Sequence, residues 1–152
     1  MKLKIISEDE YSSLDVSKLF ETDEFSRSFG CIQHHNEVVL KIAWRSDLLK
    51  PDICSLGDSI YVIGIDNNLV IIDSESLNIK VRLQLQHNYL TSIVNENILF
   101  IATELEVFLF SLDKLHLVNC KNLPDVFQSV SFNEDNIIIE CMDGLKYNLE
   151  EL

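Results

Sequence analysis

Short hydrophobic runs separated by polar turns fill most of the chain after position 29. The runs IYVIGI at 60–65 and LVII at 69–72 are apolar along nearly their whole length, which is typical of strands covered on both faces. The run IKVRLQL at 79–85 instead alternates apolar residues with Lys, Arg and Gln, which predicts an outer strand with one face exposed to solvent. The residues DNN at 66–68 tolerate the positive φ of a tight hairpin.

This succession of short strands and turns occurs three times in the sequence, at 54–86, 91–120 and 128–152. Equivalent apolar residues recur every 38 positions, at Leu69, Val107 and Leu145. Serines recur every 37 positions, at Ser55, Ser92 and Ser129. A period near 40 residues made of short strands predicts propeller blades of four antiparallel strands each.

The region before these repeats is less regular. KLKII near the N-terminus predicts a first strand, and Ser7 followed by Glu10 predicts a helix that begins with a capping box. We therefore divide the chain into an acidic segment at 1–28, a degenerate repeat at 29–53 and three blade-like repeats at 54–152. Together they predict one all-β domain, an open or partial β-propeller-like stack of about three four-stranded units with a short N-terminal α/β segment.

The run IYVIGIDNNLVIIDSESLNI at 60–79 resembles a blade of the quinoprotein type of β-propeller, with strand, hairpin, strand and an acidic exit. The resemblance covers 54–149 and extends less regularly over 29–50. The exit glycine and the outer-strand tryptophan of that family are absent, with Leu77, Asn78 and Leu115 in that region. The resemblance therefore implies a propeller-type fold and no cofactor site. An open stack of blades needs caps, so a homodimer through an open blade edge is also expected.

Charge narrows the class of partner. Twenty-five acidic and 12 basic residues give a net charge of −13, which disfavours direct binding to nucleic acid or to anionic membranes. The acidity either serves solubility or attracts a basic protein partner. For the second reading the predicted contacts are carboxylates at or beside equivalent hairpins: Asp66, Glu104, Glu106, Glu134, Asp135 and Asp143.

Candidate chemistry is sparse. None of the motifs GxSxG, HExxH, GxxxxGK[ST] and GxGxxG occurs, so we expect neither an enzyme nor a cofactor. His34 and His35, with Glu37 nearby, could begin a metal site, but adjacent strand residues point to opposite faces, which favours a polar hairpin. Aromatic residues could stack on a sugar if exposed, although core packing is the stronger expectation: Trp44, Tyr61 and Tyr89.

The four cysteines are scattered and form no CxxC pair. We expect them to be reduced and unpaired, as in a cytoplasmic protein. The N-terminus lacks the apolar core of a signal peptide, and no run approaches the roughly 18 apolar residues of a membrane span.

A small, acidic chain without catalytic motifs resembles bacterial immunity proteins. The resemblance rests on size, charge and the lack of catalytic motifs. It implies a cognate basic toxin, often a nuclease, whose active site the protein would cover. Two alternatives remain open, a propeller-type scaffold for protein interactions and a carbohydrate-binding module.

Overall fold

The computed structural model describes residues 1–21, 25–133 and 136–150. The chain divides into two compact units, Met1–Gln84 and Leu85–Leu152, which are described one at a time. The sequence-based prediction of a single domain stays a prediction.

The N-terminal unit begins with a three-stranded antiparallel sheet. Its strands are β1 (Lys2–Ile6), β2 (Ser28–His34) and β3 (Glu37–Trp44), with β2 in the middle. The helix α1 (Glu8–Ser13) follows β1. Its capping box is confirmed, because the Glu10 N–H donates to Ser7 Oγ at 3.2 Å and the Ser7 N–H donates to Glu10 Oε2 at 2.9 Å.

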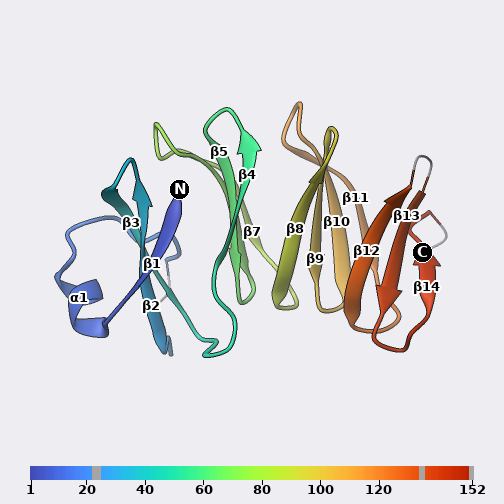
Figure 1. Ribbon diagram of the computed structural model, residues 1–152, viewed down its shortest axis with the longest axis horizontal. Coiled ribbons are helices and arrows are strands. Elements are labelled where there is room, and N and C mark those ends of the chain that lie inside the picture. The colour runs from blue at the N-terminus through green and yellow to red at the C-terminus, as the bar shows by residue number, and fades with distance from the viewer. Residues whose placement is uncertain (22–24, 134–135, 151–152) are drawn as a thin grey trace. The chain divides into compact units, whose positions relative to one another are not determined.

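The second sheet of this unit has four antiparallel strands in chain order (Figure 1). They are β4 (Asp52–Gly57), β5 (Ile60–Ile65), β6 (Asn68–Asp73) and β7 (Ile79–Gln84). The apolar strands β5 and β6 are the buried middle pair and the alternating strand β7 lies at an edge, as the hydrophobic pattern predicts.

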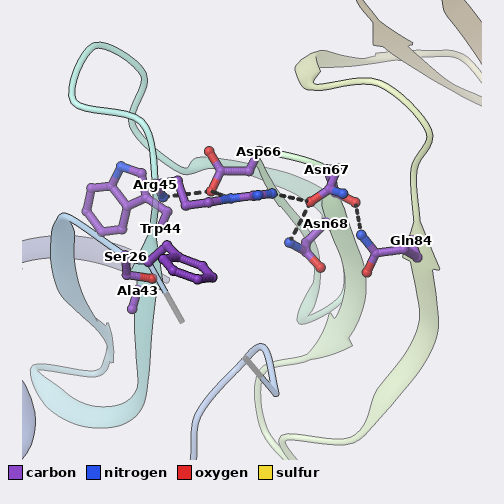
Figure 2. A pocket seen from close by; sticks show the side chains of 9 residues that line it. Ser26, Ala43, Trp44, Arg45, Asp66, Asn67, Asn68 and Gln84 are labelled. Carbon is purple, nitrogen blue, oxygen red and sulfur yellow. Dashed lines mark hydrogen bonds and ion pairs between the residues drawn. The ribbon is translucent and has the colours of Figure 1, made fainter. Parts of the chain in front are cut away.

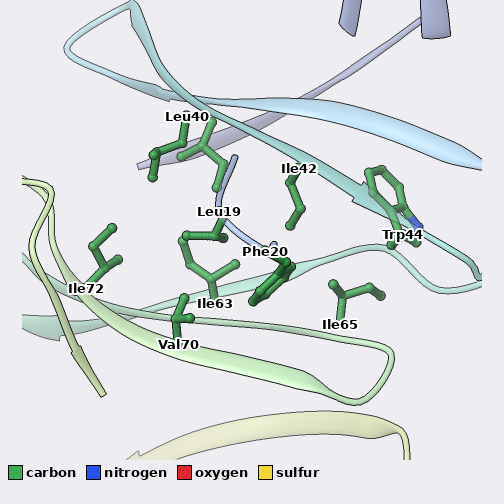
Figure 3. Packing of buried hydrophobic residues seen from close by; sticks show 10 residues of the cluster. Leu19, Phe20, Leu40, Ile42, Trp44, Ile63, Ile65, Val70 and Ile72 are labelled. Carbon is green, nitrogen blue, oxygen red and sulfur yellow. The ribbon is translucent and has the colours of Figure 1, made fainter. Parts of the chain in front are cut away.

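The core of the N-terminal unit lies between these two sheets (Figure 3). Residues 17–20 run beside β3, where the Leu19 N–H donates to the Lys41 carbonyl at 2.8 Å. This placement inserts Leu19 and Phe20 among the isoleucines and valines of both sheets, where they are almost fully buried. Trp44 is 3% exposed and donates its Nε1–H to the Leu49 carbonyl, so the expectation of core packing is confirmed.

The C-terminal unit contains two further antiparallel sheets. One has the order β11-β10-β9-β8, and its strands are β8 (Tyr89–Asn95), β9 (Ile98–Thr103), β10 (Glu106–Ser111) and β11 (His116–Asn122). The other has the order β12-β13-β14, and its strands are β12 (Phe127–Asn133), β13 (Asn136–Cys141) and β14 (Lys146–Asn148). Phe100, Phe127 and Ile139 form the centre of a core that the two sheets share.

The prediction of an all-β chain of repeated antiparallel sheets is confirmed. Two sheets have four strands, and two have three among the residues described, including the last repeat. All four cysteines are free, as expected: Cys31, Cys54, Cys120 and Cys141.

Candidate functional site

Asp66 occupies the turn between β5 and β6, where its φ of 50° fits the predicted hairpin. Its side chain does not face solvent, because the residue is only 7% exposed. Oδ2 accepts the backbone N–H of Arg45 at 2.8 Å and lies 3.9 Å from Arg45 Nε (Figure 2). The Asp66 carboxylate therefore contacts Arg45 of the same unit, and it is not exposed to solvent as its hairpin position suggested.

A pocket of about 280 Å³ adjoins this pair (Figure 2). Arg45 Nη2 donates to Asn67 Oδ1 at 3.0 Å, and Gln84 Nε2 donates to the Asn67 carbonyl at 3.2 Å. The residues that line the pocket include no histidine or cysteine, and their one carboxylate is paired with Arg45. Several polar groups of the lining are therefore bonded to one another: Arg45, Asp66, Asn67 and Gln84.

Glu104 lies in the turn between β9 and β10, in the C-terminal unit, and is half-buried. Its carboxylate accepts the backbone N–H of Asn88 at 3.3 Å and the Asn88 side-chain amide at 3.2 Å. These contacts fix the orientation of the carboxylate and leave part of it facing water.

Glu106 is the first residue of β10 and is only 7% exposed. Its backbone is held by Thr103, whose hydroxyl accepts the Glu106 N–H at 2.9 Å and donates to the Glu106 carbonyl at 3.1 Å. Carboxylate oxygen Oε2 has no hydrogen-bond partner in the described part of the chain. Partial desolvation and, second, the charge of Glu106 raise the pKa of the Cys120 thiol on the neighbouring edge strand β11.

Asp143 lies in the turn between β13 and β14 and is exposed. One carboxylate oxygen accepts the Leu145 N–H and the other accepts the Tyr147 hydroxyl, both at 2.9 Å. The hydrogen bond to Asp143 is the main cause of a raised pKa at Tyr147. Asp143 thus presents a fixed negative charge to solvent.

The connection at 123–127 joins the turns that carry these carboxylates. The Phe127 N–H donates to the Glu104 carbonyl, and the Met142 N–H donates to the Val126 carbonyl, both at 2.8 Å. Asp125 lies in this connection and is half-buried. We use the term acidic rim for the four carboxylates of this end of the C-terminal unit: Glu104, Glu106, Asp125 and Asp143.

Sequence analysis missed Asp125, because it lies outside the repeated hairpins on which the prediction was based. Its signal in the sequence is the segment LPDV, which places an acidic residue just before β12 in a short loop. Two of the predicted contacts, Glu134 and Asp135, lie outside the described residues. Asp66 belongs to the other unit and is not part of the acidic rim.

One group of three potential metal ligands occurs among the residues described, and it consists of His34, His35 and Glu75. The histidines flank the β2–β3 hairpin, as predicted, but their carboxylate neighbour is Glu75 and not the expected Glu37.

The aromatic residues considered for sugar binding mostly belong to the core. Trp44 and Tyr89 are each 3% exposed, and Tyr61 is half-buried against the core of the N-terminal unit. A stacking platform for a sugar ring needs exposed aromatic faces, and neither buried residue offers one.

Comparison with solved structures supports the fold. The crystal structure of the computationally designed Ika4 protein is similar over 88% of this chain and 94% of Ika4, at 11% identity and a TM-score of 0.55. The computationally designed Ika8 protein is similar over 83% of this chain and 40% of Ika8, also at 11% identity and a TM-score of 0.55. No protein-family model matches the sequence, and no curated protein is similar to it.

These similarities show the fold alone, and they therefore define only the structural class of the protein. The chain is an all-β protein with a β-propeller-like fold. None of the helical residues described forms a segment long and apolar enough to cross a membrane.

Proposed function

We propose that this is a non-enzymatic binding protein that receives a basic protein partner on the acidic rim of its C-terminal unit. The observation that carries the proposal is that backbone hydrogen bonds of the connection that carries Asp125 join it to the turns of Glu104 and Asp143. In the same unit, Glu106 has a buried carboxylate oxygen without a hydrogen-bond partner among the described residues. Lysine and arginine side chains are the groups that complement such a surface.

The distribution of charge supports this placement. Residues 85–152 contain 11 acidic and three basic residues, so they carry eight of the 13 net negative charges in under half of the chain. A single-sign surface of this kind accelerates encounter with a partner of opposite charge. Within this unit, the ion pair Lys146–Glu140, at 3.8 Å, joins two residues outside the acidic rim.

Glu106 gives the proposal a specific anchor. A buried carboxylate oxygen without a hydrogen bond is costly, because it has lost water and gained no donor. Such groups are few in natural proteins, and a ligand or a functional role is one reason for keeping them. An arginine or lysine of the partner, arriving past Asn122 on the edge strand β11, would supply the missing donor.

The partner that we propose is a cognate toxin in the cytoplasm, and the chain would act as its immunity protein. The small size, the acidity and the lack of catalytic motifs support this choice over an enzyme. A binding role of this kind requires no cofactor. A propeller-type interaction scaffold is the alternative, supported by the β-propeller-like fold.

The experiment is a binding measurement between the purified chain and the product of the adjacent gene. The test variant is Glu104→Gln/Asp125→Asn/Asp143→Asn, which removes three charges while keeping side-chain shape. A matched control is Glu8→Gln/Asp9→Asn/Asp15→Asn, which removes three exposed charges from the N-terminal unit.

The proposal predicts that the control binds as the wild type does, whereas the rim variant binds more weakly. Equal weakening by both triple variants would assign the effect to net charge and remove the acidic rim as the site. Binding to several unrelated cellular proteins, and not to the adjacent product, would favour a scaffold over an immunity protein.

A further inference from the structure

His34 and His35 face the same carboxylate, although they are consecutive in the chain. His34 Nε2 lies 3.1 Å from Glu75 Oε1, and His35 Nε2 lies 3.7 Å from the same oxygen. The two imidazole centroids are 4.0 Å apart. One potential ligand atom from each of the three residues fits within a span of 4.8 Å.

The backbone explains this convergence. Successive residues of a strand alternate between its faces, but His34 is the last residue of β2 and His35 belongs to the turn. His35 and Asn36 have φ values of 48° and 69°, so the chain reverses there in the left-handed region. The reversal breaks the alternation and lets both rings project to one side. The sequence-based argument against joint binding by the two histidines therefore does not hold.

Glu75 is positioned independently by the turn between β6 and β7. Its backbone N–H donates to Asp73 Oδ1 at 3.0 Å, and the Ser76 N–H donates to the same oxygen at the same distance. This local turn orders the segment that carries Glu75 beside the β2–β3 hairpin.

We propose that His34, His35 and Glu75 form a binding site for a divalent transition-metal ion, with zinc as the best match. Zinc binds imidazole nitrogen and carboxylate oxygen at about 2.0–2.2 Å, so ligands of a tetrahedral site lie roughly 3.4 Å apart. The observed separations of 3.1 and 3.7 Å lie on either side of that value. Three protein ligands leave a fourth position for water.

The donor set selects the class of metal. Two imidazole nitrogens and one carboxylate suit zinc, copper, nickel or cobalt, whereas calcium and magnesium prefer oxygen ligands alone. His35 and Glu75 are exposed, so a metal ion has direct access from solvent. Their exposure also allows the small movements that closure around the ion requires.

The charged groups around the cluster are of both signs. The basic residue Lys2 and the half-buried Met1 line an adjoining cavity of about 370 Å³. The acidic residue Glu37 lies opposite His34 in the register of strands β2 and β3. His34 belongs to the first sheet of the N-terminal unit, and Glu75 follows the third strand of the second sheet. A bound ion would therefore link these two sheets within the unit, which predicts that it raises the unit's thermal stability.

Zinc titration by calorimetry tests the site in a Cys54→Ser/Cys120→Ser background, which removes the two thiols that are not fully buried. The test variants are His35→Asn and Glu75→Gln. Asn tolerates the left-handed backbone at position 35, so the first change removes the ligand and preserves the turn. His116→Ala is the matched control, because His116 is an exposed histidine of the other unit.

We expect one zinc ion per chain and a melting temperature that rises with zinc concentration. Each test variant should weaken zinc binding by about tenfold or more and abolish most of the thermal shift. The His116→Ala variant should match the background in both measurements. Failure to bind zinc, or an affinity that both test variants leave unchanged, would overturn the proposal.

Discussion

The Asp66 side chain holds the backbone of Arg45 in place, because Asp66 Oδ2 accepts the Arg45 N–H at 2.8 Å. The contact lies where the connection after β3 passes the β5–β6 turn. The two residues are 21 positions apart: Arg45 directly follows β3 of the first sheet, and Asp66 lies in the β5–β6 turn of the second sheet. This charge-assisted hydrogen bond is largely shielded from water, because Asp66 is 7% exposed. Asp66 is therefore a structural carboxylate that secures the end of β3.

Replacing Asp66 with Ala should destabilise the N-terminal unit by about 1–3 kcal/mol, because the Arg45 N–H loses its acceptor in a partly buried setting. Chemical denaturation measures the change. Asp143→Ala is the control, since Asp143 is exposed and its side-chain hydrogen bonds go to Leu145 and Tyr147, within four residues along the chain. A loss at Asp66 no larger than that at Asp143 would argue against the structural role.

The capping box predicts an acid-sensitive contribution to stability. Backbone and side-chain hydrogen bonds from Ser7 lower the pKa of Glu10 from its ordinary value of 4.5. Because the folded-state pKa lies below the unfolded value, the contribution is present above about pH 4.5 and is lost as the pH falls through the lowered value.

Thermal unfolding of the wild type and of Glu10→Gln checks this prediction between pH 7 and pH 3. The difference in melting temperature should shrink as the pH falls, because protonation removes the charge that the substitution has already removed. A difference that stays constant across this range would show that the carboxylate charge does not matter at the cap.

Thiol reactivity should separate the cysteines by burial. Cys31 is 2% exposed and Cys141 is fully buried, and burial is the main cause of the raised pKa of both thiols. Iodoacetamide should therefore leave both unmodified in the folded chain while it labels the exposed Cys120 slowly. Mass spectrometry of the native and the denatured chain measures the order, and fast labelling of Cys141 in the native chain would contradict it.

Much of the fold could be predicted because hydrophobic periodicity reports burial directly. The continuous runs of β5 and β6 and the alternation of β7 specify their places in the sheet. The segment at 17–20 could not be placed in the same way. It pairs with β3 through only a few backbone hydrogen bonds, and Leu19 and Phe20 are too short a run to show a period.

The candidate site was harder to predict because it depends on contacts between segments distant in the sequence. Equivalent positions in the repeats identified Glu104 and Asp143 correctly as turn residues. The same positions did not indicate that Asp66 accepts a hydrogen bond from Arg45. They also did not indicate that the connection at 123–127, which carries Asp125, is bonded to these turns. His35 shows the same limit, because its positive φ reverses the direction that strand alternation implies.

Glu106 should show opposite effects on stability and on binding. Glu106→Met keeps the length of the side chain and removes the buried oxygen that lacks a partner, so the free chain should gain about 1–2 kcal/mol. Binding to a basic partner should weaken, because the anchor for its cation is gone. Denaturation and calorimetry on the same preparations test both halves, and a destabilised Glu106→Met chain would show that the carboxylate serves the fold.

The association rate at two salt concentrations tests the central claim most directly. The wild type and the Glu104→Gln/Asp125→Asn/Asp143→Asn variant are mixed with the product of the adjacent gene, below and above about 0.1 M salt, where the Debye length is roughly 10 Å. The acidic rim predicts fast association of the wild type at low salt, a marked decrease at high salt, and a slower, less salt-sensitive rate for the variant. Equal rates for the two proteins at both salt concentrations would contradict the assignment of the acidic rim as the binding surface.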